Sequence, residues 1–314
     1  MKSRYIIGSR GSRLALWQAE WAKTALEAAH PGVVFTIDVI KTSGDTMKDT
    51  PLAVIGGKGV FIKEIEDALL TRSIDIAVHS LKDMPTTLHD DLSVAAITKR
   101  EDPRDAIIWR AGVDLEATSL TTLPVEAVVG TSSPRRLAQL KHLFKDRVVK
   151  DLRGNVDTRL RKLDAGWYDA IVLAAAGLHR LGLEERISFY VNPAEMLPAV
   201  GQGALCVETR ADDNEAMDIV KGLNDAQTAA ACQSERALLR SLGGGCQLPI
   251  AGFATVDRDN IRLEGLVASV NGDTVIRDCA EGPTSDAERV GTVLAESLNA
   301  KGASALLDRT HLGP

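Results

Sequence analysis

The sequence has few cysteines and no pair of them at the spacing of a zinc ribbon or a local disulfide. Its four cysteines, Cys206, Cys232, Cys246 and Cys279, are far apart in the chain. We therefore expect neither a disulfide framework nor a cysteine-rich metal site. The histidines include no pair at i, i+4, so a local helical metal motif is absent as well. The chemistry of this chain must come from other side chains.

Long apolar runs are also lacking, since no run approaches the ~20 residues that span a bilayer. The first eight residues enter a strand-like segment and lack the apolar region and cleavage site of a signal peptide. These features predict a cytoplasmic protein. The net charge of −6 at pH 7 makes general nucleic-acid binding a poor fit. Any anion site must therefore depend on arginines placed locally.

Strand-like and helix-like segments alternate over the first two-thirds of the chain, which predicts open α/β domains with largely parallel sheets. The expected strands are 5–7, 33–40, 74–78, 92–97, 127–130, 147–152 and 169–174, and the expected helices are 14–29, 60–71, 134–144 and 156–165. From residue 226 the pattern changes to a helix, three alternating strands and a final helix. That order predicts a small C-terminal α+β domain with an antiparallel sheet.

Two short stretches of the first half recur in the second. The segment 8–14 resembles 130–137, and 74–78 resembles 168–172. Two related lobes would enclose a cleft, as in two-lobed proteins that bind small molecules. Because the similarity is short, a structural repeat and a chance likeness both stay open at this point.

Cations recur close to the positions where helices are expected to begin. Ser12 and Ser133 are the expected N-caps of two of these helices. A helix N-terminus already carries roughly half a positive charge, so repeated cations indicate that an anion normally lies there. A guanidinium group can donate two parallel hydrogen bonds to one carboxylate. The alternatives are solvated arginines, pairing with nearby Asp and Glu, and phosphate binding, although no phosphate-binding glycine loop is present. The cations are Arg10, Arg13, Lys58, Arg135, Arg136, Arg153 and Arg159.

The expected strand 74–78 runs into a polar turn. Ligands of α/β sheets collect beyond the carboxyl ends of the strands, which places Ser80, Lys82 and Asp83 at the ligand site. For Asp83, a turn cap or an ion pair with Lys82 is the alternative. His79 is expected to be a packing residue.

Three glycines, 243–245, precede Cys246. Glycines allow a bulky group to approach the backbone, and the loop leaves the thiol open. We expect Cys246 to be a reactive thiol or an attachment point. A second glycine-rich connection, 42–59, has the length of a lid or a disordered loop. Phe61 follows at its edge, with ordinary core packing as the alternative.

Taken in order, these motifs resemble the porphobilinogen deaminase family over nearly the whole chain. Any one of them is weak, but all of them in this order are highly specific. The motifs are Thr42–Asp45, Gly56–Gly59, His79–Asp83, Arg100–Asp105, Gly130–Ser133, Arg135–Arg136, Leu152–Val156, Leu197–Gly203 and the glycine–cysteine loop.

The resemblance implies three domains, 1–98 with 203–222, 103–198 and 226–314, the first two similar to two-lobed periplasmic binding proteins. It implies a dipyrromethane cofactor joined by a thioether to Cys246. It also implies that four porphobilinogen molecules are condensed head to tail with loss of ammonia, and that water then releases hydroxymethylbilane. A monomer is implied, with hand-over of the product to a uroporphyrinogen-III synthase.

By the same resemblance Asp83 is the catalytic carboxylate, and the loop 45–59 with Lys58 and Phe61 is a mobile lid. Many members have a lysine where this chain has Val54, and proline or another residue at Arg13. The side chains implied to bind the cofactor and substrate acids are Arg10, Ser12, Ser80, Lys82, Arg100, Thr131, Ser132, Arg135, Arg136, Arg153, Arg159 and Arg180.

Two other functions remain open from the residues alone. A two-lobed sensor for a polycarboxylate would explain the arginines but not the glycine–cysteine loop. A cysteine-nucleophile acyl transferase would need a histidine close to Cys246, and none is near it in the sequence.

Overall fold

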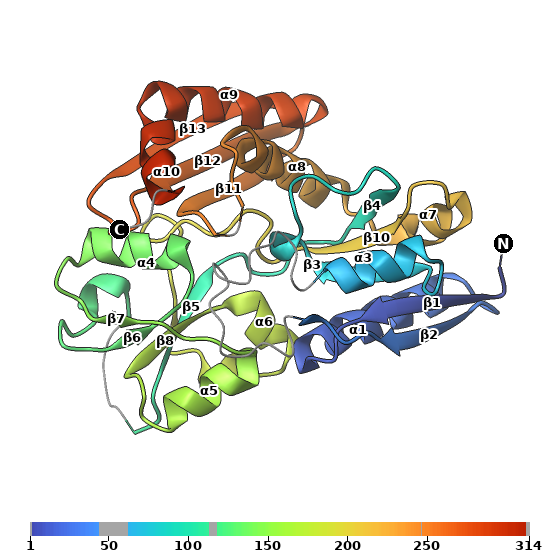
Figure 1. The fold of residues 1–314 in the computed structure, drawn as a ribbon, viewed down its shortest axis with the longest axis horizontal. Helices are drawn as coiled ribbons and strands as arrows, with labels where there is room; N and C mark the ends of the chain where they lie inside the picture. The colour runs from blue at the N-terminus through green and yellow to red at the C-terminus, as the bar shows by residue number, and fades with distance from the viewer. Residues whose placement is uncertain (1, 44–61, 113–117, 246, 312–314) are drawn as a thin grey trace. The chain divides into compact units, whose positions relative to one another are not determined.

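The computed structural model describes residues 2–43, 62–112, 118–245 and 247–311 (Figure 1). The chain divides into two compact units, Met1–Glu101 with Ala204–Ala229 and Asp102–Gly203 with Ala230–Pro314. The finer division into three domains stays a prediction. Within the described residues, no helix is long and apolar enough to cross a membrane.

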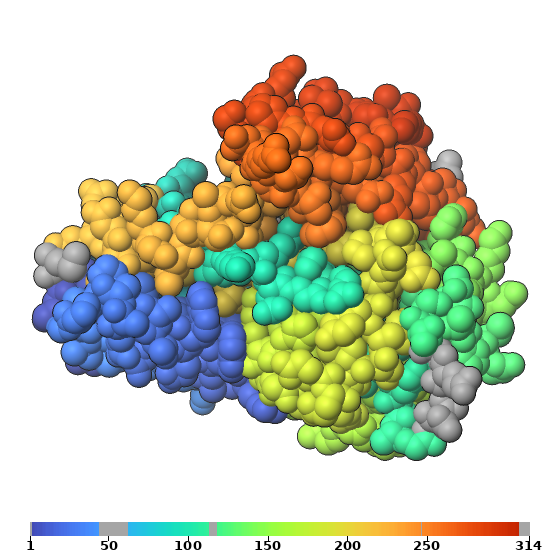
Figure 2. Space-filling view, turned by 180° about the vertical axis from the view of Figure 1, so that it is seen from behind, coloured from blue at the N-terminus to red at the C-terminus, as the bar shows by residue number. Residues whose placement is uncertain are grey.

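In the described part of the first unit, five strands form a mixed sheet in the order β2-β1-β3-β10-β4. Strand β1 is parallel to β2 and β3, whereas β10 is antiparallel to β3 and β4. Figure 2 shows the gold segment that contains β10 and α7 beside the blue segments of the same unit. The strands are β1 (Arg4–Ser9), β2 (Val34–Val39), β3 (Ile76–Ser80), β4 (Leu92–Ile97) and β10 (Leu205–Arg210).

Helices cover both faces of this sheet. On one face, α1 (Arg13–Ala29) and α7 (Asn214–Val220) bury an apolar cluster that includes Ile76, Val78, Leu205 and Val207. On the other, α3 (Lys63–Leu70) packs Ile65 and Leu69 on Ile74, Ala77 and Leu92. The alternation of strand side chains between faces explains why both layers are apolar. A single 3₁₀ turn, η1 (Leu81–Asp83), follows β3.

In the second unit, the described residues form another mixed sheet of five strands, in the order β7-β6-β8-β5-β9. Strand β6 is parallel to β7 and β8, and β5 is antiparallel to β8 and β9. The strands are β5 (Asp105–Trp109), β6 (Val129–Gly130), β7 (Val149–Lys150), β8 (Ala170–Ala174) and β9 (Phe189–Tyr190), and the helices are α4 (Pro134–Leu143), α5 (Val156–Asp164) and α6 (Ala175–Arg180).

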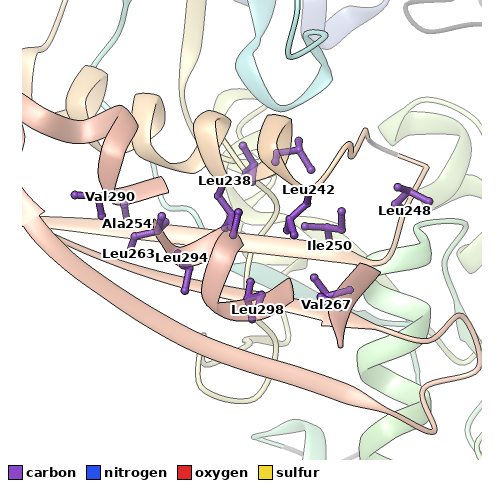
Figure 3. Packing of buried hydrophobic residues seen from close by; sticks show 14 of the residues in the cluster. Leu238, Leu242, Leu248, Ile250, Ala254, Leu263, Val267, Val290, Leu294 and Leu298 are labelled. Atoms are coloured by element: carbon purple, nitrogen blue, oxygen red, sulfur yellow. The ribbon is translucent and has the colours of Figure 1, made fainter. Parts of the chain in front are cut away.

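A three-stranded antiparallel sheet completes the described part of the second unit, in the order β11-β12-β13 (Ile250–Asp257, Asn260–Ala268, Val275–Pro283). Helices α8 (Ala226–Ser241) and α9 (Ala287–Ala300) bury one face of it, and α10 (Ala303–His311) contributes to the same core. Figure 3 shows Leu238 and Leu242 of α8 and Leu294 and Leu298 of α9 directed into this core. The other face packs Ala251 and Leu266 against Ala138 of α4.

The predicted fold class of two α/β lobes and a small antiparallel α+β part is confirmed. The expectation of largely parallel sheets was incomplete, because each five-stranded sheet contains one strand that runs antiparallel to both its neighbours. These strands, β5 and β10, are buried along their whole length and were not predicted. The helices α6, α7 and α10 were not predicted either.

Candidate functional site

A hollow of about 80 Å³ lies in the first unit where β1 and β3 end and α1 begins. That volume exceeds the roughly 10–15 Å³ that a single water needs. Four of the predicted residues, Arg10, Ser12, Ser80 and Asp83, line it together. Its position agrees with the rule that ligands collect beyond the carboxyl ends of strands. Lys82 and Arg100 are not among the residues that line this hollow.

The polar side of the hollow is formed by the start of α1. Ser12 is the N-cap, as predicted, and its hydroxyl accepts a hydrogen bond from the backbone N–H of Ala15 at 3.3 Å. The first turn of α1 contains no acidic residue, and Arg13 occupies the first helical position. The helix end and Arg10 therefore give this side of the hollow a positive field that favours an anion.

Gln18 orients the hydroxyl of Ser80. Gln18 is 3% exposed, and its Nε2 donates to Ser80 Oγ at 2.9 Å. Because an amide NH₂ can only donate, Ser80 must accept here, and its own O–H is left to donate elsewhere. Gln18 also lines the hollow, although the sequence analysis did not select it. Gln18 lies on the buried face of α1, where side chains normally pack in the core, so nothing in the sequence marks it as part of a site.

Asp83 is held at the rim by buried residues on both sides. Leu81 and Met84 are 1% and 2% exposed, whereas Asp83 is exposed. The backbone N–H of Leu81 donates to Ala204 O at 3.0 Å, and that of Met84 to Leu81 O at 3.1 Å. The turn is thus tied to the sheet, and it presents a carboxylate to the hollow from a rigid backbone.

In the second unit the predicted arginines at the start of α4 already have a carboxylate partner. Asp105 is fully buried, and its oxygens accept from Arg135 Nη1 at 2.7 Å and Arg136 Nη2 at 2.7 Å. Gln202 Nε2 donates to the same carboxylate at 2.9 Å. Burial opposes ionisation of Asp105, but the two guanidinium charges outweigh it and lower the pKa of this carboxyl. For α4, an anion from within the chain offsets the helix-end cations. Whether Arg135 and Arg136 also bind a ligand stays a prediction.

Two hydroxyls follow β6. Ser132 Oγ donates to Leu152 O at 2.6 Å and accepts from Leu152 N at 2.9 Å. These two hydrogen bonds fix the backbone just before Arg153. Thr131 is 3% exposed, and its Oγ1 accepts from Ser133 N at 3.2 Å. Ser133 is the predicted N-cap of α4, with Pro134 at the first helical position. The ligand roles of Thr131 and Ser132 stay predictions.

The remaining predicted arginines of the second unit differ in burial: Arg153 and Arg159 are partly exposed, whereas Arg180 is buried. Arg153 Nε donates to Asp151 at 2.9 Å, and Arg159 Nε donates to Gly154 O at 2.8 Å, both beside the start of α5. Burial raises the pKa of Asp151, but the nearby Ser132 hydroxyl and Arg153 guanidinium lower it further than burial raises it. Arg180 is 8% exposed and donates to Gly203 O at 2.6 Å.

The glycine loop before Cys246 has a structural cause of its own. Gly243 has φ +66°, a conformation that favours glycine at the end of a helix such as α8. A Cβ on Gly244 would lie 2.5 Å from Ile250 Cδ1 and 2.7 Å from Leu239 Cδ1. At Gly244 the bulky groups that approach the backbone are therefore the chain's own side chains, whereas no described atom lies within 4 Å of a Cβ on Gly243 or Gly245. Cys246 itself lies outside the described residues, as do Lys58, Phe61 and Val54.

No group of three or more His, Cys, Asp and Glu side chains that could hold a metal occurs in the described ranges. Gln18, beside Ser80, and Asp105, beside Arg135 and Arg136, were not predicted as neighbours of the site residues. Both are polar side chains that are only 0–3% exposed. Since a buried polar group needs a partner, such residues stand out once burial is known, but the sequence alone gives no sign of burial.

Comparison with known proteins shows what the chain is similar to. The family described as porphobilinogen deaminase, dipyromethane cofactor binding domain, matches residues 5–218. The description porphobilinogen deaminase, C-terminal domain, matches residues 229–300. A porphobilinogen deaminase of Gloeobacter violaceus is 52% identical over 98% of this chain and 94% of its own length. One of Syntrophobacter fumaroxidans is 47% identical over 97% of each chain.

Among solved structures, the chain is similar to a variant of ArgBP from T. maritima, with 13% identity over 70% of this chain and 87% of that one and a TM-score of 0.37. A TRAP periplasmic solute binding protein from Ralstonia eutropha gives 12% identity, coverage of 71% and 76%, and a TM-score of 0.41.

The relatives decide between the three functions left open by the residues. The family matches extend through both the cofactor-binding part and the C-terminal part of the chain, and the relatives described above are named porphobilinogen deaminase. This chain belongs to the porphobilinogen deaminase family, and it is a dipyrromethane-dependent enzyme that condenses porphobilinogen into the linear tetrapyrrole hydroxymethylbilane.

Proposed function

We propose that Asp83 is the catalytic carboxylate of this reaction and that Cys246 is the attachment point of the dipyrromethane. The observation that carries the first assignment is the hollow of the first unit, which brings Asp83 together with Arg10, Ser12 and Ser80. One acid faces a cation and two hydroxyls there. That combination serves a substrate that carries both acidic side chains and a ring on which positive charge develops.

The residues present fit the dipyrromethane. Its acetate and propionate groups need cationic and hydroxyl donors, and the first unit offers Arg10 and the oriented hydroxyl of Ser80. In the second unit, Thr131, Arg153 and Arg159 are our proposed carboxylate partners. A charge-assisted hydrogen bond contributes about 1.5–3 kcal/mol, and several are needed because unpaired carboxylates in a partly dry site are costly.

When bound, the dipyrromethane supplies the free pyrrole carbon to which the first porphobilinogen is joined. Porphobilinogen has an aminomethyl group that is protonated at neutral pH, so ammonia leaves with little help from an acid. Its departure leaves positive charge on the pyrrole ring of the substrate. We assign Asp83 to stabilise that charge as an anion beside the ring N–H and to accept the proton lost when the new carbon–carbon bond forms. The rigid turn keeps Asp83 in place for each round.

Substitution of Asp83 tests this assignment. In the holoenzyme, Asp83→Asn should lower turnover about 10²–10³-fold, the usual effect of removing an electrostatic stabiliser, while the cofactor stays attached. Asp83→Glu should keep a fraction of the activity. Asp90→Asn, an exposed acid in the same unit, is the matched control and should leave turnover unchanged. Ammonia release is the measurement, and full activity of Asp83→Asn would remove Asp83 from the mechanism.

Intact mass tests the attachment at Cys246. The native protein should carry one adduct equal in mass to two porphobilinogens less two ammonias. Cys246→Ser should lack it, because the thiolate is the nucleophile that captures the electrophilic methylene. Cys279→Ser, an exposed cysteine on β13, should keep the adduct. An unmodified native protein with full activity would contradict the proposal.

We further propose that the enzyme acts as a monomer in the cytoplasm and passes its product to a uroporphyrinogen-III synthase. Sedimentation should then give a mass near 33.6 kDa plus the adduct. Adding the synthase should shorten the lifetime of free hydroxymethylbilane beyond what its catalytic rate alone produces. A dimer at working concentration, or an unchanged lifetime, would contradict the respective part.

A further inference from the structure

A fully buried carboxylate joins three segments of the second unit. Glu235 of α8 is 0% exposed. Its Oε1 accepts a hydrogen bond from the backbone N–H of Ala254 in β11 at 2.7 Å, and its Oε2 accepts one from the backbone N–H of Gly201 at 2.7 Å. A buried carboxylate is costly unless its oxygens are hydrogen-bonded, so these two short bonds hold the chain around Gly201 to α8 and β11. The two elements also share the apolar core of Figure 3.

The two bonds require a carboxylate at position 235. A carboxylate offers one acceptor oxygen to each N–H, whereas the amide of glutamine has a single acceptor oxygen and an NH₂ group that can only donate. With glutamine, one buried backbone N–H would lose its acceptor and face another donor. Gly201 itself has φ +72°, a conformation that glycine adopts without strain. A specific glycine and a specific acid therefore meet at this point.

Gly201 belongs to residues 197–203, which we call the connecting segment because the chain leaves the second unit directly after it. Leu197 packs in the apolar cluster on the second face of the C-terminal sheet. The backbone N–H of Gly252 in β11 donates to Pro198 O at 3.2 Å. Together with the bond from Gly201 to the carboxylate, these contacts fix the connecting segment to the frame formed by α8 and β11.

The connecting segment in turn orients two of the predicted ligand arginines. Leu197 O accepts from Arg135 Nη1 at 2.8 Å, and Gly203 O accepts from Arg180 Nη2 at 2.6 Å. The two arginines are 5% and 8% exposed, so these backbone carbonyls help to set the direction of each guanidinium group. Arg135 is also held by the buried ion pair described above. A shift of Gly201 should therefore act mainly on Arg180, whose acceptor lies only two residues further along the chain.

We propose that Glu235 is a positioning residue that acts on Arg180 through the connecting segment. The frame of α8 and β11, which precedes and follows the loop that contains Cys246, thereby sets the direction of a guanidinium group that binds a carboxylate of the substrate. Loss of Glu235 weakens binding of the carboxylated pyrrole and leaves the chemical step in place. This inference rests on the reaction of the family and on the predicted ligand role of Arg180, and it is independent of the assignment of Asp83.

Steady-state kinetics and ligand binding test the proposal in the holoenzyme. Glu235→Gln should raise KM for porphobilinogen about tenfold, because one charge-assisted hydrogen bond is weakened, and should change kcat less. Calorimetry with a pyrrole that carries acetate and propionate groups but no aminomethyl group should show a matching increase in Kd. Asp213→Asn is the matched control, since Asp213 is a buried acid of the first unit that accepts from Ala216 N at 3.0 Å. The control should lose stability and keep KM and Kd.

A double variant separates positioning from a merely structural role. If Glu235 acts through Arg180, Arg180→Gln should by itself raise KM, and adding Glu235→Gln should raise it no further. With a merely structural role the two factors would multiply. Multiplying factors, or an unchanged KM in either single variant, overturns the proposal. Failure of the attachment at Cys246 would appear differently, as a native protein without the adduct in intact-mass measurements.

Gln202 keeps the proposal testable if Glu235→Gln does not fold. Its Nε2 donates to Pro103 O at 2.7 Å and to Asp105 Oδ1 at 2.9 Å, so it anchors the connecting segment to the lobe rather than to the C-terminal sheet. Gln202→Met has a side chain of similar length that cannot donate these bonds. It should raise KM and Kd in the same direction as Glu235→Gln. Values equal to those of the wild type would show that the connecting segment does not position the arginines, and would overturn the proposal.

Discussion

The two five-stranded lobes have the same architecture. The orders β2-β1-β3-β10-β4 and β7-β6-β8-β5-β9 correspond strand for strand, each with one antiparallel strand in the same place. The details correspond as well. Asp75 Oδ2 accepts from Ile6 N at 2.9 Å, and Asp169 Oδ2 accepts from Val128 N at 2.9 Å. The short likeness seen in the sequence is therefore a structural repeat.

The lobes differ where the first helix meets the antiparallel strand. The sheet registers and the N-caps place Arg135 and Arg136 of α4 where α1 has Leu14 and Ala15. By the same registers, Asp105 of β5 stands where β10 has Leu205, since each pairs with the last residue of the third strand. A buried ion pair thus occupies the second lobe at the place where the first has apolar residues beside an open hollow.

A position that both lobes share can therefore serve either ligand binding or internal charge balance. In both lobes a helix N-terminus points to the carboxyl ends of the strands. In the first, the small and apolar residues leave room there for a ligand. In the second, Asp105 supplies an anion for the helix end itself. Arg153 and Arg159, at the next helix start, are partly exposed, in contrast to the buried Arg135 and Arg136.

Breaking the ion pair of the second lobe should have the largest effect. Asp105→Asn leaves two buried guanidinium groups without a countercharge, and removal of one partner of such a pair costs about 3–5 kcal/mol. Chemical denaturation measures it. Asp164→Asn, which breaks the exposed pair with Arg186, is the control and should cost about 0–1 kcal/mol. A cost for Asp105→Asn as small as that of the control would show that the pair is not what distinguishes this lobe.

The same pair has a predictable pH dependence. The pKa of Asp105 is lowered in the folded state, so its contribution to stability is complete above the ordinary carboxyl pKa of about 3.9. The contribution is lost as pH falls through the lower folded value. The difference in unfolding free energy between the wild type and Asp105→Asn should therefore be constant at neutral pH and become smaller in acid. A difference that grows in acid would contradict the assignment.

Alanine substitution of the corresponding glycines, Gly8 and Gly130, should reduce stability by different amounts. A Cβ on Gly8 would meet the tip of Ile74, Cδ1 at 2.3 Å, whereas one on Gly130 would meet the ring of Tyr168 at 2.8 Å. The Tyr168 ring is held by its hydroxyl, which donates to Asp151 O at 2.6 Å. An isoleucine tip can turn away more easily than an anchored ring. We expect Gly130→Ala to lower the free energy of unfolding by about 1–3 kcal/mol and Gly8→Ala to lower it by less. Thermal unfolding of both variants checks the order.

The matched aspartates should show the smallest difference. Asp75→Ala and Asp169→Ala each remove an acceptor from a backbone N–H, and each should cost about 1–3 kcal/mol. Asp75 also pairs with Lys2 at 2.8 Å and Arg210 at 3.3 Å, so its loss should exceed that of Asp169, which has Arg110 at 3.5 Å. Equal costs would mean that the charge partners add nothing to the shared hydrogen bond.

The sequence predicted what depends on local patterns. Periodicity located most strands and helices, and the N-caps Ser12 and Ser133 were correct, because a hydroxyl before an apolar helix satisfies the first backbone N–H groups. It did not predict β5 and β10. The short apolar run of β5 has no periodicity that distinguishes a buried strand from a helix segment. In β10 the second half is polar, and its partner β3 lies more than a hundred residues away in the chain.

For the site, the sequence determined which residue types were available, since strand ends and helix starts put Ser80, Asp83 and Arg10 near ligand positions by local rules alone. Only the tertiary structure decided how the charges are shared. Pairing of β5 with β8 carried Asp105 to Arg135 and Arg136, and pairing of β10 with β3 carried Glu208 to His79. Such neighbours come from distant parts of the chain, so burial and long-range strand pairing, rather than any local motif, select which cations and acids meet.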